Sequence, residues 1–306
     1  MIIRKVLDFR IVWRVGRKRM LVLAAISTSV YLLYEHFGNK AIVVSTIPAS
    51  ILGVALAFLI GFRVNSAYER WWEARKIWGA LINDSRTFAR QVITFINPKP
   101  DHDPEEDRSS GVRKTLIYGQ LGYVYALKNH LRRKDIFEET APFFDEADMG
   151  ELKNAKHVPN AIILLQARRI QAALNEGHTE DFRHMQLDNT LNRLCDSMGA
   201  AERIKNTVFP RQYSYYSTTF TRIYSYLLPF ILVRECGWTV IPFTLIIGFI
   251  FFALDSIASG IENPFENSVN DIPMNSICRT IEINLKEMLG EPDLPSPVEP
   301  VNGFLY

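Results

Sequence analysis

The sequence predicts an all-α membrane protein with four transmembrane helices in two hairpins and a large helical insert between them. Residues 41–62 and 236–254 form uncharged runs of 22 and 19 residues. At about 1.5 Å per helical residue, either run can cross a hydrocarbon layer about 30 Å thick. In contrast, residues 63–212 carry 44 of the 68 charged side chains. Averages of 48% hydrophobic and 22% charged residues hide this segregation.

Two further spans complete the hairpins. Residues 20–34 are a borderline span of 15 uncharged residues, and an interfacial helix is the alternative. Residues 213–233 form the third span, although they contain Arg222. An arginine at mid-depth costs at least ~2.5–3.5 kcal/mol on insertion scales, so we expect Arg222 near an interface or facing protein.

The amino-terminal arm sets the expected orientation. It carries seven basic residues against Asp8: Arg4, Lys5, Arg10, Arg14, Arg17, Lys18 and Arg19. The positive-inside rule places this arm in the cytoplasm, and four spans return the insert and the carboxyl terminus to the same side. No cleavable signal is evident, so we expect a multi-pass protein of the inner (plasma) membrane. The expected parts are a basic arm (1–19), hairpin 1 (20–62), a helical cytosolic domain (63–212), hairpin 2 (213–256), and a turn, helix and tail (257–306).

The insert has helical periodicity. Residues 158–176 read as one helix, and an apolar stripe at 4-3 spacing predicts packing in an antiparallel bundle. Residues 97–110, with three prolines and five acids, predict a solvated loop. Near the carboxyl end, Asp271 is the expected N-cap of a helix, Pro273 lies in its first turn and Gly290 ends it. The stripe consists of Leu187, Leu191, Leu194, Met198, Ala201 and Val208.

No pattern indicates an enzyme or a cofactor. Cys195, Cys236 and Cys278 lack metal-binding spacing and are expected to be free thiols. The six histidines are scattered, and the pair His178 and His184 does not make a metal site. Catalytic and nucleotide-binding motifs are missing from the sequence. The near-neutral charge gives no footprint for nucleic acid.

The second span carries two stripes at four-residue spacing. Gly53, Ala57 and Gly61 are small and allow close helix packing. The neighbouring stripe is bulky and apolar. It either faces lipid and other spans, or it surrounds a central axis and forms a narrow neck that closes when water leaves it. No helix breaker follows the span, so the helix can continue to Glu69 and Glu73. The bulky stripe consists of Val54, Phe58 and Phe62.

Two separated motifs resemble the bestrophin family of ion channels, especially its bacterial branch. The first is residues 47–63 (IPASILGVALAFLIGFR) with residues 68–75 (YERWWEAR). The second is residues 262–265 (ENPF) with residues 270–275 (NDIPMN). The order of the parts also fits: two spans, a helical insert, two spans and the Asn-Pro-Phe turn.

The resemblance implies a homopentameric channel that passes small monovalent ions through one axial pore. It implies that Val54, Phe58 and Phe62 line the neck, and that Phe182 forms a second restriction in a cytosolic vestibule. Without the resemblance, Phe182 would be expected to pack in the core and anchor the helix that follows it. Both alternatives, the buried core residue and the pore restriction, stay open.

The chain departs from the animal members of the family at the calcium clasp. Only two acids occur in the six residues after Phe265, whereas calcium takes six to eight oxygen ligands. We therefore expect no tight calcium site and no other cofactor. Glu262, Glu266 and Asp271 stay as weak metal candidates, with capping and solvation favoured for them.

The sign of the permeant ion is left open. Glu69 and Glu73 on the continued stripe slightly favour cations. If the helix is rotated, Arg63 and Arg70 face the pore instead and favour anions. The two arginines otherwise form ion pairs. Animal relatives pass anions, so chloride stays open. A receptor or scaffold with a helical cytosolic platform and no conduction is the main alternative. A coupled transporter is disfavoured because mid-span charges are nearly lacking.

Overall fold

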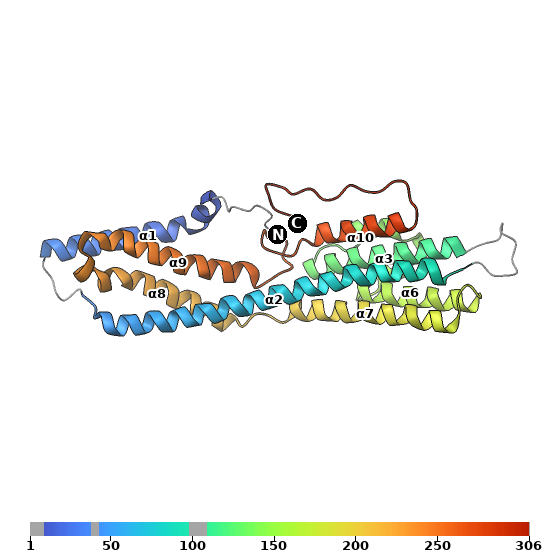
Figure 1. Ribbon diagram of the computed structural model, residues 1–306, viewed down its shortest axis with the longest axis horizontal. Coiled ribbons are helices and arrows are strands. Elements are labelled where there is room, and N and C mark those ends of the chain that lie inside the picture. The colour runs from blue at the N-terminus through green and yellow to red at the C-terminus, as the bar shows by residue number, and fades with distance from the viewer. Residues whose placement is uncertain (1–8, 38–42, 98–108, 306) are drawn as a thin grey trace. The chain divides into compact units, whose positions relative to one another are not determined.

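The computed structural model describes residues 9–37, 43–97 and 109–305. Within these ranges the chain is helical without a named strand, and an isolated bridge pairs Val301 with Phe304. The all-α prediction is therefore confirmed. The longer helices are labelled in Figure 1. Along the chain the elements are α1 (Phe9–Phe37), α2 (Thr46–Phe95), α3 (Ser109–Arg132), α4 (Phe137–Thr140), η3 (Ala141–Phe143), α5 (Glu146–Asn154), α6 (Val158–Asn175), α7 (Asp181–Asn206), α8 (Arg211–Cys236), η4 (Gly237–Thr239), α9 (Val240–Ile261) and α10 (Met274–Met288).

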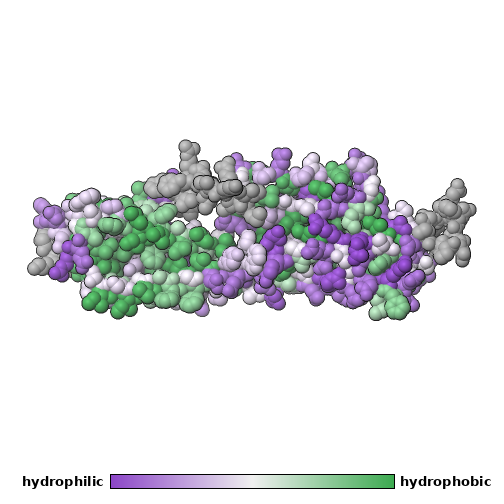
Figure 2. Space-filling view, viewed as in Figure 1, coloured by the Kyte–Doolittle hydropathy of each residue, from purple (hydrophilic) through white to green (hydrophobic). Residues whose placement is uncertain are grey.

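The chain divides into two compact units. The apolar unit comprises Arg4–Trp71 and Val208–Asn263, and the polar unit comprises Trp72–Thr207 and Pro264–Tyr306. Apolar side chains gather over the surface of the first unit, whereas charged and polar side chains cover most of the second (Figure 2). The five-part division expected from the sequence stays a prediction.

Helix α2 is a single helix of 50 residues. Pro48 lies in its first turn, where a missing amide donor costs nothing, and no proline follows inside the helix. The expected continuation past Phe62 to Glu73 is therefore present, and the helix runs on to Phe95. Its first part belongs to the apolar unit and its second part to the polar unit.

The apolar unit packs α1 and α8 against α9. Met20 and Leu23 of α1 meet Phe252 of α9 in one buried cluster. A second buried cluster joins Val30 of α1 to Val233 and Val240. Apolar side chains therefore join these three helices at two places along their length.

By length and composition, two described helical stretches could cross a membrane: α2, and residues Arg211–Ile261, which hold α8, η4 and α9. Helix α1 does not meet the same criterion among the described residues. Its expected span, residues 20–34, stays a prediction. Most of the basic arm and residues 98–108 of the expected loop lie outside the described residues or side chains.

The polar unit packs α3 against α6 and α10, and α6 against α7. The buried side of α7 contains the expected apolar stripe from Leu187 to Ala201. The prediction that Val208 is the last member of this stripe is wrong. Helix α7 ends at Asn206, and Val208 is 56% exposed, because the chain leaves the helical register two residues earlier.

The carboxyl helix differs from expectation at its start and agrees at its end. Pro273, not Asp271, occupies the cap position of α10. The Asp271 carboxylate instead accepts hydrogen bonds from the backbone amide and hydroxyl of Ser268, which closes the preceding turn. Gly290 has φ +76°, the left-handed conformation that glycine adopts most readily after a helix.

Candidate functional site

The bulky stripe of α2 faces away from its own chain. Val54, Phe58 and Phe62 are 59%, 64% and 65% exposed, whereas Leu56 and Ile60 on the opposite side are buried. The Phe58 and Phe62 rings stack with centroids 6.5 Å apart. The span therefore has two apolar faces, one used within the chain and one left for lipid, another subunit or a pore.

The small-residue stripe is used in two ways. A Cβ added at Gly53 would overlap the hydroxyl of Tyr224 on α8, so the missing side chain allows this close approach. A Cβ added at Gly61 meets nothing within 4 Å in the chain. Ala57 is also exposed. Only the first position of the stripe therefore serves packing inside the chain.

Arg63 follows the last aromatic residue of the stripe and is 2% exposed. Its guanidinium donates to Asp255 Oδ1 at 2.6 Å and to the Ser259 hydroxyl at 2.8 Å, both on α9. It also lies 3.3 Å from Glu262. Thr218 of α8 donates to the same Asp255 oxygen at 2.7 Å. This network ties α2, α8 and α9 together.

The position of Arg63 decides one alternative left open by the sequence. Its side chain pairs inside the apolar unit and does not share the exposed face of Phe62. A buried arginine with a carboxylate partner holds the rotation of its helix, because turning it would leave both charges unpaired. The network therefore orients the bulky stripe outward.

The two acids on the continued stripe are already engaged. Glu69 accepts a hydrogen bond from Asn65 at 2.7 Å. Glu73 forms an ion pair with Arg203 of α7 at 2.7 Å. The pair places a positive charge beside Glu73 and weakens the local negative potential that the cation lean assumed.

Phe182 lies in the first turn of α7 and is 82% exposed. An anchor of the helix core would be buried, so the core-anchor prediction is wrong for this chain. An aromatic ring that its own chain leaves in the open agrees with a position facing a vestibule, which stays a prediction.

The weak calcium candidates each have a partner. Glu262 accepts from Ser214 as well as lying near Arg63. Glu266 pairs with Lys205 at 2.7 Å. Asp271 closes its own turn with Ser268. These side chains serve ion pairing and turn formation in the described part of the chain.

A cluster that the sequence did not predict lies in the polar unit. His130, His157 and Glu202 bring one ligand atom each within 4.8 Å of one another. No sequence spacing signals it, because the three residues are far apart along the chain. The pKa of His130 lies below its ordinary value of 6.5, because burial disfavours the charged ring and His157 adds repulsion, while Glu202 acts in the opposite direction.

Comparison with known families decides the relationship. The family model described as Bacterial/Fungal Bestrophin protein matches residues 5–287. The chain belongs to the bestrophin family. This bestrophin is 29% identical to the voltage-dependent anion channel-forming protein RSc3414 of Ralstonia nicotianae, over 90% of this chain and 88% of that one. It is 31% identical to the voltage-dependent anion channel-forming protein YneE of Escherichia coli, over 87% of this chain and 83% of that one.

Solved structures show the same fold. A crystal structure of a bacterial bestrophin homologue from Klebsiella pneumoniae, phased with zinc, matches with a TM-score of 0.81 and 28% identity, over 90% of this chain and 98% of that one. The bestrophin resemblance predicted from the two motifs is thereby confirmed. Family membership and the relatives' names indicate a membrane channel rather than an enzyme.

Proposed function

We propose that this bestrophin forms a homopentameric channel that passes small monovalent anions passively through a neck lined by Val54, Phe58 and Phe62. The exposed bulky face of α2 carries the proposal. A chain that packs one apolar face of the helix and leaves large rings open on the other has a surface available for a central axis. The names of the relatives support conduction.

The neck acts through the cost of wetting an apolar constriction. Rings of valine and phenylalanine offer an ion no polar partner, so an ion must keep its water or lose it cheaply. Such a neck favours weakly hydrated ions and closes when its water is expelled. The stacked rings of Phe58 and Phe62 make the two inner layers, and Val54 makes the layer nearest the start of α2.

The sign of the ion follows from charges outside the neck. The relatives are named for anions, and the pairing of Glu73 with Arg203 offsets the acid that favoured cations. Phe182 forms the second restriction of the vestibule in this proposal. The spans cross the inner (plasma) membrane as two hairpins with both termini in the cytoplasm.

Reconstitution of the purified chain in liposomes tests the proposal. We expect a passive current that reverses near the Nernst potential of chloride and moves when chloride is replaced by gluconate. A reversal potential that follows the sodium gradient instead would overturn the anion assignment. The proposal that the protein is a channel would still stand. Liposomes that conduct no more than empty ones would contradict conduction and favour the scaffold alternative.

A further inference from the structure

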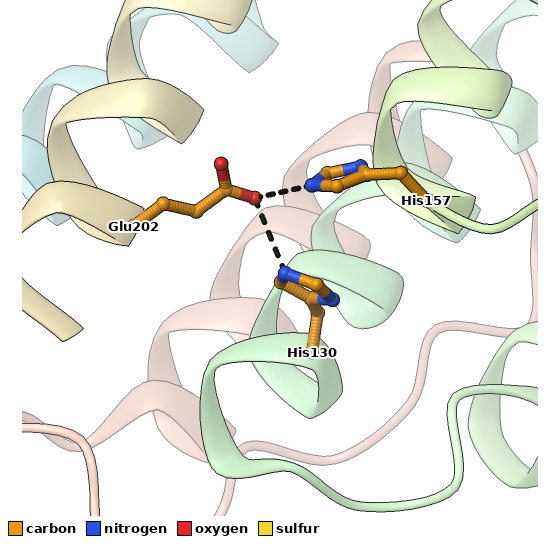
Figure 3. A group of neighbouring side chains, drawn as sticks. All are labelled: His130, His157 and Glu202. Atoms are coloured by element: carbon orange, nitrogen blue, oxygen red, sulfur yellow. Dashed lines mark hydrogen bonds and ion pairs between the residues drawn. The ribbon is translucent and has the colours of Figure 1, made fainter. Parts of the chain in front are cut away.

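The cluster of His130, His157 and Glu202 is assembled by three helices of the polar unit. His130 lies in the last turn of α3, His157 occupies the cap position of α6, and Glu202 lies near the end of α7. Figure 3 shows both imidazole rings directed at one oxygen of the carboxylate. The distances to Glu202 Oε1 are 3.2 Å from His130 Nε2 and 2.7 Å from His157 Nε2.

The two distances to Glu202 are close to those of ligands that share a first-row metal ion, and all three ligand atoms lie within 4.8 Å of one another. Zinc binds imidazole nitrogen and carboxylate oxygen at about 2.0–2.2 Å, so neighbouring ligand atoms of a tetrahedral ion lie about 3.3 Å apart. The His130 to Glu202 distance already has this value. The His157 to Glu202 distance of 2.7 Å would open by about 0.6 Å to admit the ion at those bond lengths, and the two imidazole nitrogens would settle at the same separation.

Space beside the cluster leaves a further coordination position. The three side chains border a cavity of about 430 Å³ that also touches Leu131, Ile136 and Asn206. Two imidazoles and one carboxylate with an open position form the donor set of zinc sites that keep a water ligand. Hard ions such as calcium and magnesium prefer six or more oxygen ligands, which the cluster does not offer.

Nearby cations oppose metal binding only in part. Lys205 lines the same cavity but pairs with Glu266 at 2.7 Å. Arg133 and Lys134 are exposed at its edge, where solvent and salt screen their charge. The remaining positive potential would attract a small anion or hydroxide to the open position of a bound ion.

His157 has a second role that the metal would change. The backbone amide of Asn160 donates to His157 Nδ1 at 3.2 Å, which caps α6. Because Nδ1 accepts that hydrogen bond, Nε2 carries the ring proton and donates it to Glu202. Coordination through Nε2 moves that proton to Nδ1 and breaks the cap. The metal-free and metal-bound forms therefore differ in the tautomer of one ring.

We propose that His130, His157 and Glu202 form a binding site for one divalent transition-metal ion per subunit, zinc foremost, with a fourth position open to solvent. The ion would clamp the ends of α3 and α7 to the start of α6. This site is separate from the neck, so its test does not depend on conduction.

The tag-free, full-length protein in detergent can be titrated with zinc by calorimetry and with cobalt by visible absorption. We expect one saturable site per subunit and the intense bands of tetrahedral cobalt, displaced by zinc but not by calcium or magnesium. Loss of a ligand should weaken binding beyond the ~10–100-fold that outer-shell changes cost. The variants are His130→Ala, His157→Asn and Glu202→Gln.

The controls separate ligation from folding. Asparagine is a good helix cap, so His157→Asn keeps the cap of α6 but removes the ligand nitrogen. His184→Ala removes a histidine from the same helix as Glu202 and should leave binding unchanged. The proposal is overturned if the unmodified protein shows no saturable site, if the three variants bind as tightly as it does, or if His184→Ala abolishes binding.

Discussion

Arg63 shows how a single side chain can set the rotation of a long helix. Its guanidinium is 2% exposed and lies 2.6 Å from Asp255. Removing one partner of a buried pair leaves the other charge without compensation, which costs far more than the pair contributes net. The sequence allowed two roles for Arg63, a charge that faces the pore and a member of an ion pair. Helical spacing alone does not fix which face of the helix turns toward the rest of the chain.

The first prediction concerns this network. We expect Arg63→Gln to lower the free energy of unfolding by about 3–5 kcal/mol, because the buried Asp255 carboxylate then keeps only the longer ion pair, 3.5 Å from Arg19. Thermal unfolding in detergent, followed by circular dichroism, measures the effect. Arg222→Gln, which changes an exposed arginine on α8, is the control.

A double variant checks that the cost belongs to the pair. Adding Asp255→Asn to Arg63→Gln should restore part of the lost stability, since the most deeply buried carboxylate is then gone and the charges that lose a partner, Arg19 and Glu262, are partly exposed to solvent. If Arg63→Gln is no less stable than Arg222→Gln, the network does not hold α2 as described.

The second prediction concerns the charges near the inner end of the stripe. Glu73→Gln leaves Arg203 without its acid partner, so we expect the reversal potential to move toward stronger anion preference. Arg203→Gln should move it in the opposite direction. Bi-ionic reversal potentials in liposomes measure both shifts. Identical values for both variants and the unmodified protein would remove this pair from the ion pathway.

At the scale of the element, the sequence predicted α2 well. Uncharged length predicted the span, and the lack of a helix breaker predicted its continuation. The two stripes followed from four-residue spacing. What the sequence could not supply was the partner of each stripe. Gly53 contacts Tyr224 from a helix more than 150 residues later, and such pairing depends on tertiary packing.

The third prediction compares two glycines of one stripe. Gly53→Ala should destabilise the apolar unit by about 1–3 kcal/mol, because the new methyl group overlaps Tyr224. Gly61→Ala should leave the stability of the single chain unchanged, since its Cβ meets no neighbour there. Thermal unfolding of the two variants side by side is the measurement.

Rescue gives this prediction a second check. Tyr224→Phe removes the hydroxyl and should recover part of the stability of Gly53→Ala, while the ring carbon that bore it stays close at 2.9 Å. Equal stability of the Gly53 and Gly61 variants would show that the close approach of α2 and α8 does not exist.

Helix ends were less predictable than helix interiors. The α7 stripe was correct to Ala201, but Val208 lies past the end of the helix, because spacing does not reveal where a register stops. Asp271 has a side chain suited to capping, yet it bonds to Ser268 in the turn before α10. Several polar groups near a helix start compete for such roles.

At the scale of the whole molecule, the sequence predicted the fold class, the family and three free thiols, and Cys195, Cys236 and Cys278 are free in the structure. It did not predict the cluster of His130 and His157 with Glu202. Apolar periodicity and motifs report local order, whereas this cluster depends on how three helices meet.

The assembly of several chains also depends on tertiary contacts, which local sequence patterns do not report. Exposed apolar side chains on α2 indicate a surface that needs a partner. The pentamer, the neck and the vestibule restriction at Phe182 therefore belong together as one proposal, and a change in the neck should alter conduction without altering the fold.

The most direct test is the conductance of Phe58→Ala in planar bilayers, beside Phe243→Ala as a control that makes the same change at an exposed ring of α9. Removing the Phe58 ring widens the neck and lowers the cost of wetting it, so we predict a higher conductance or open probability for this variant and an unchanged current for the control. A Phe58→Ala current equal to that of the unmodified protein would contradict the claim that this face of α2 surrounds the pore.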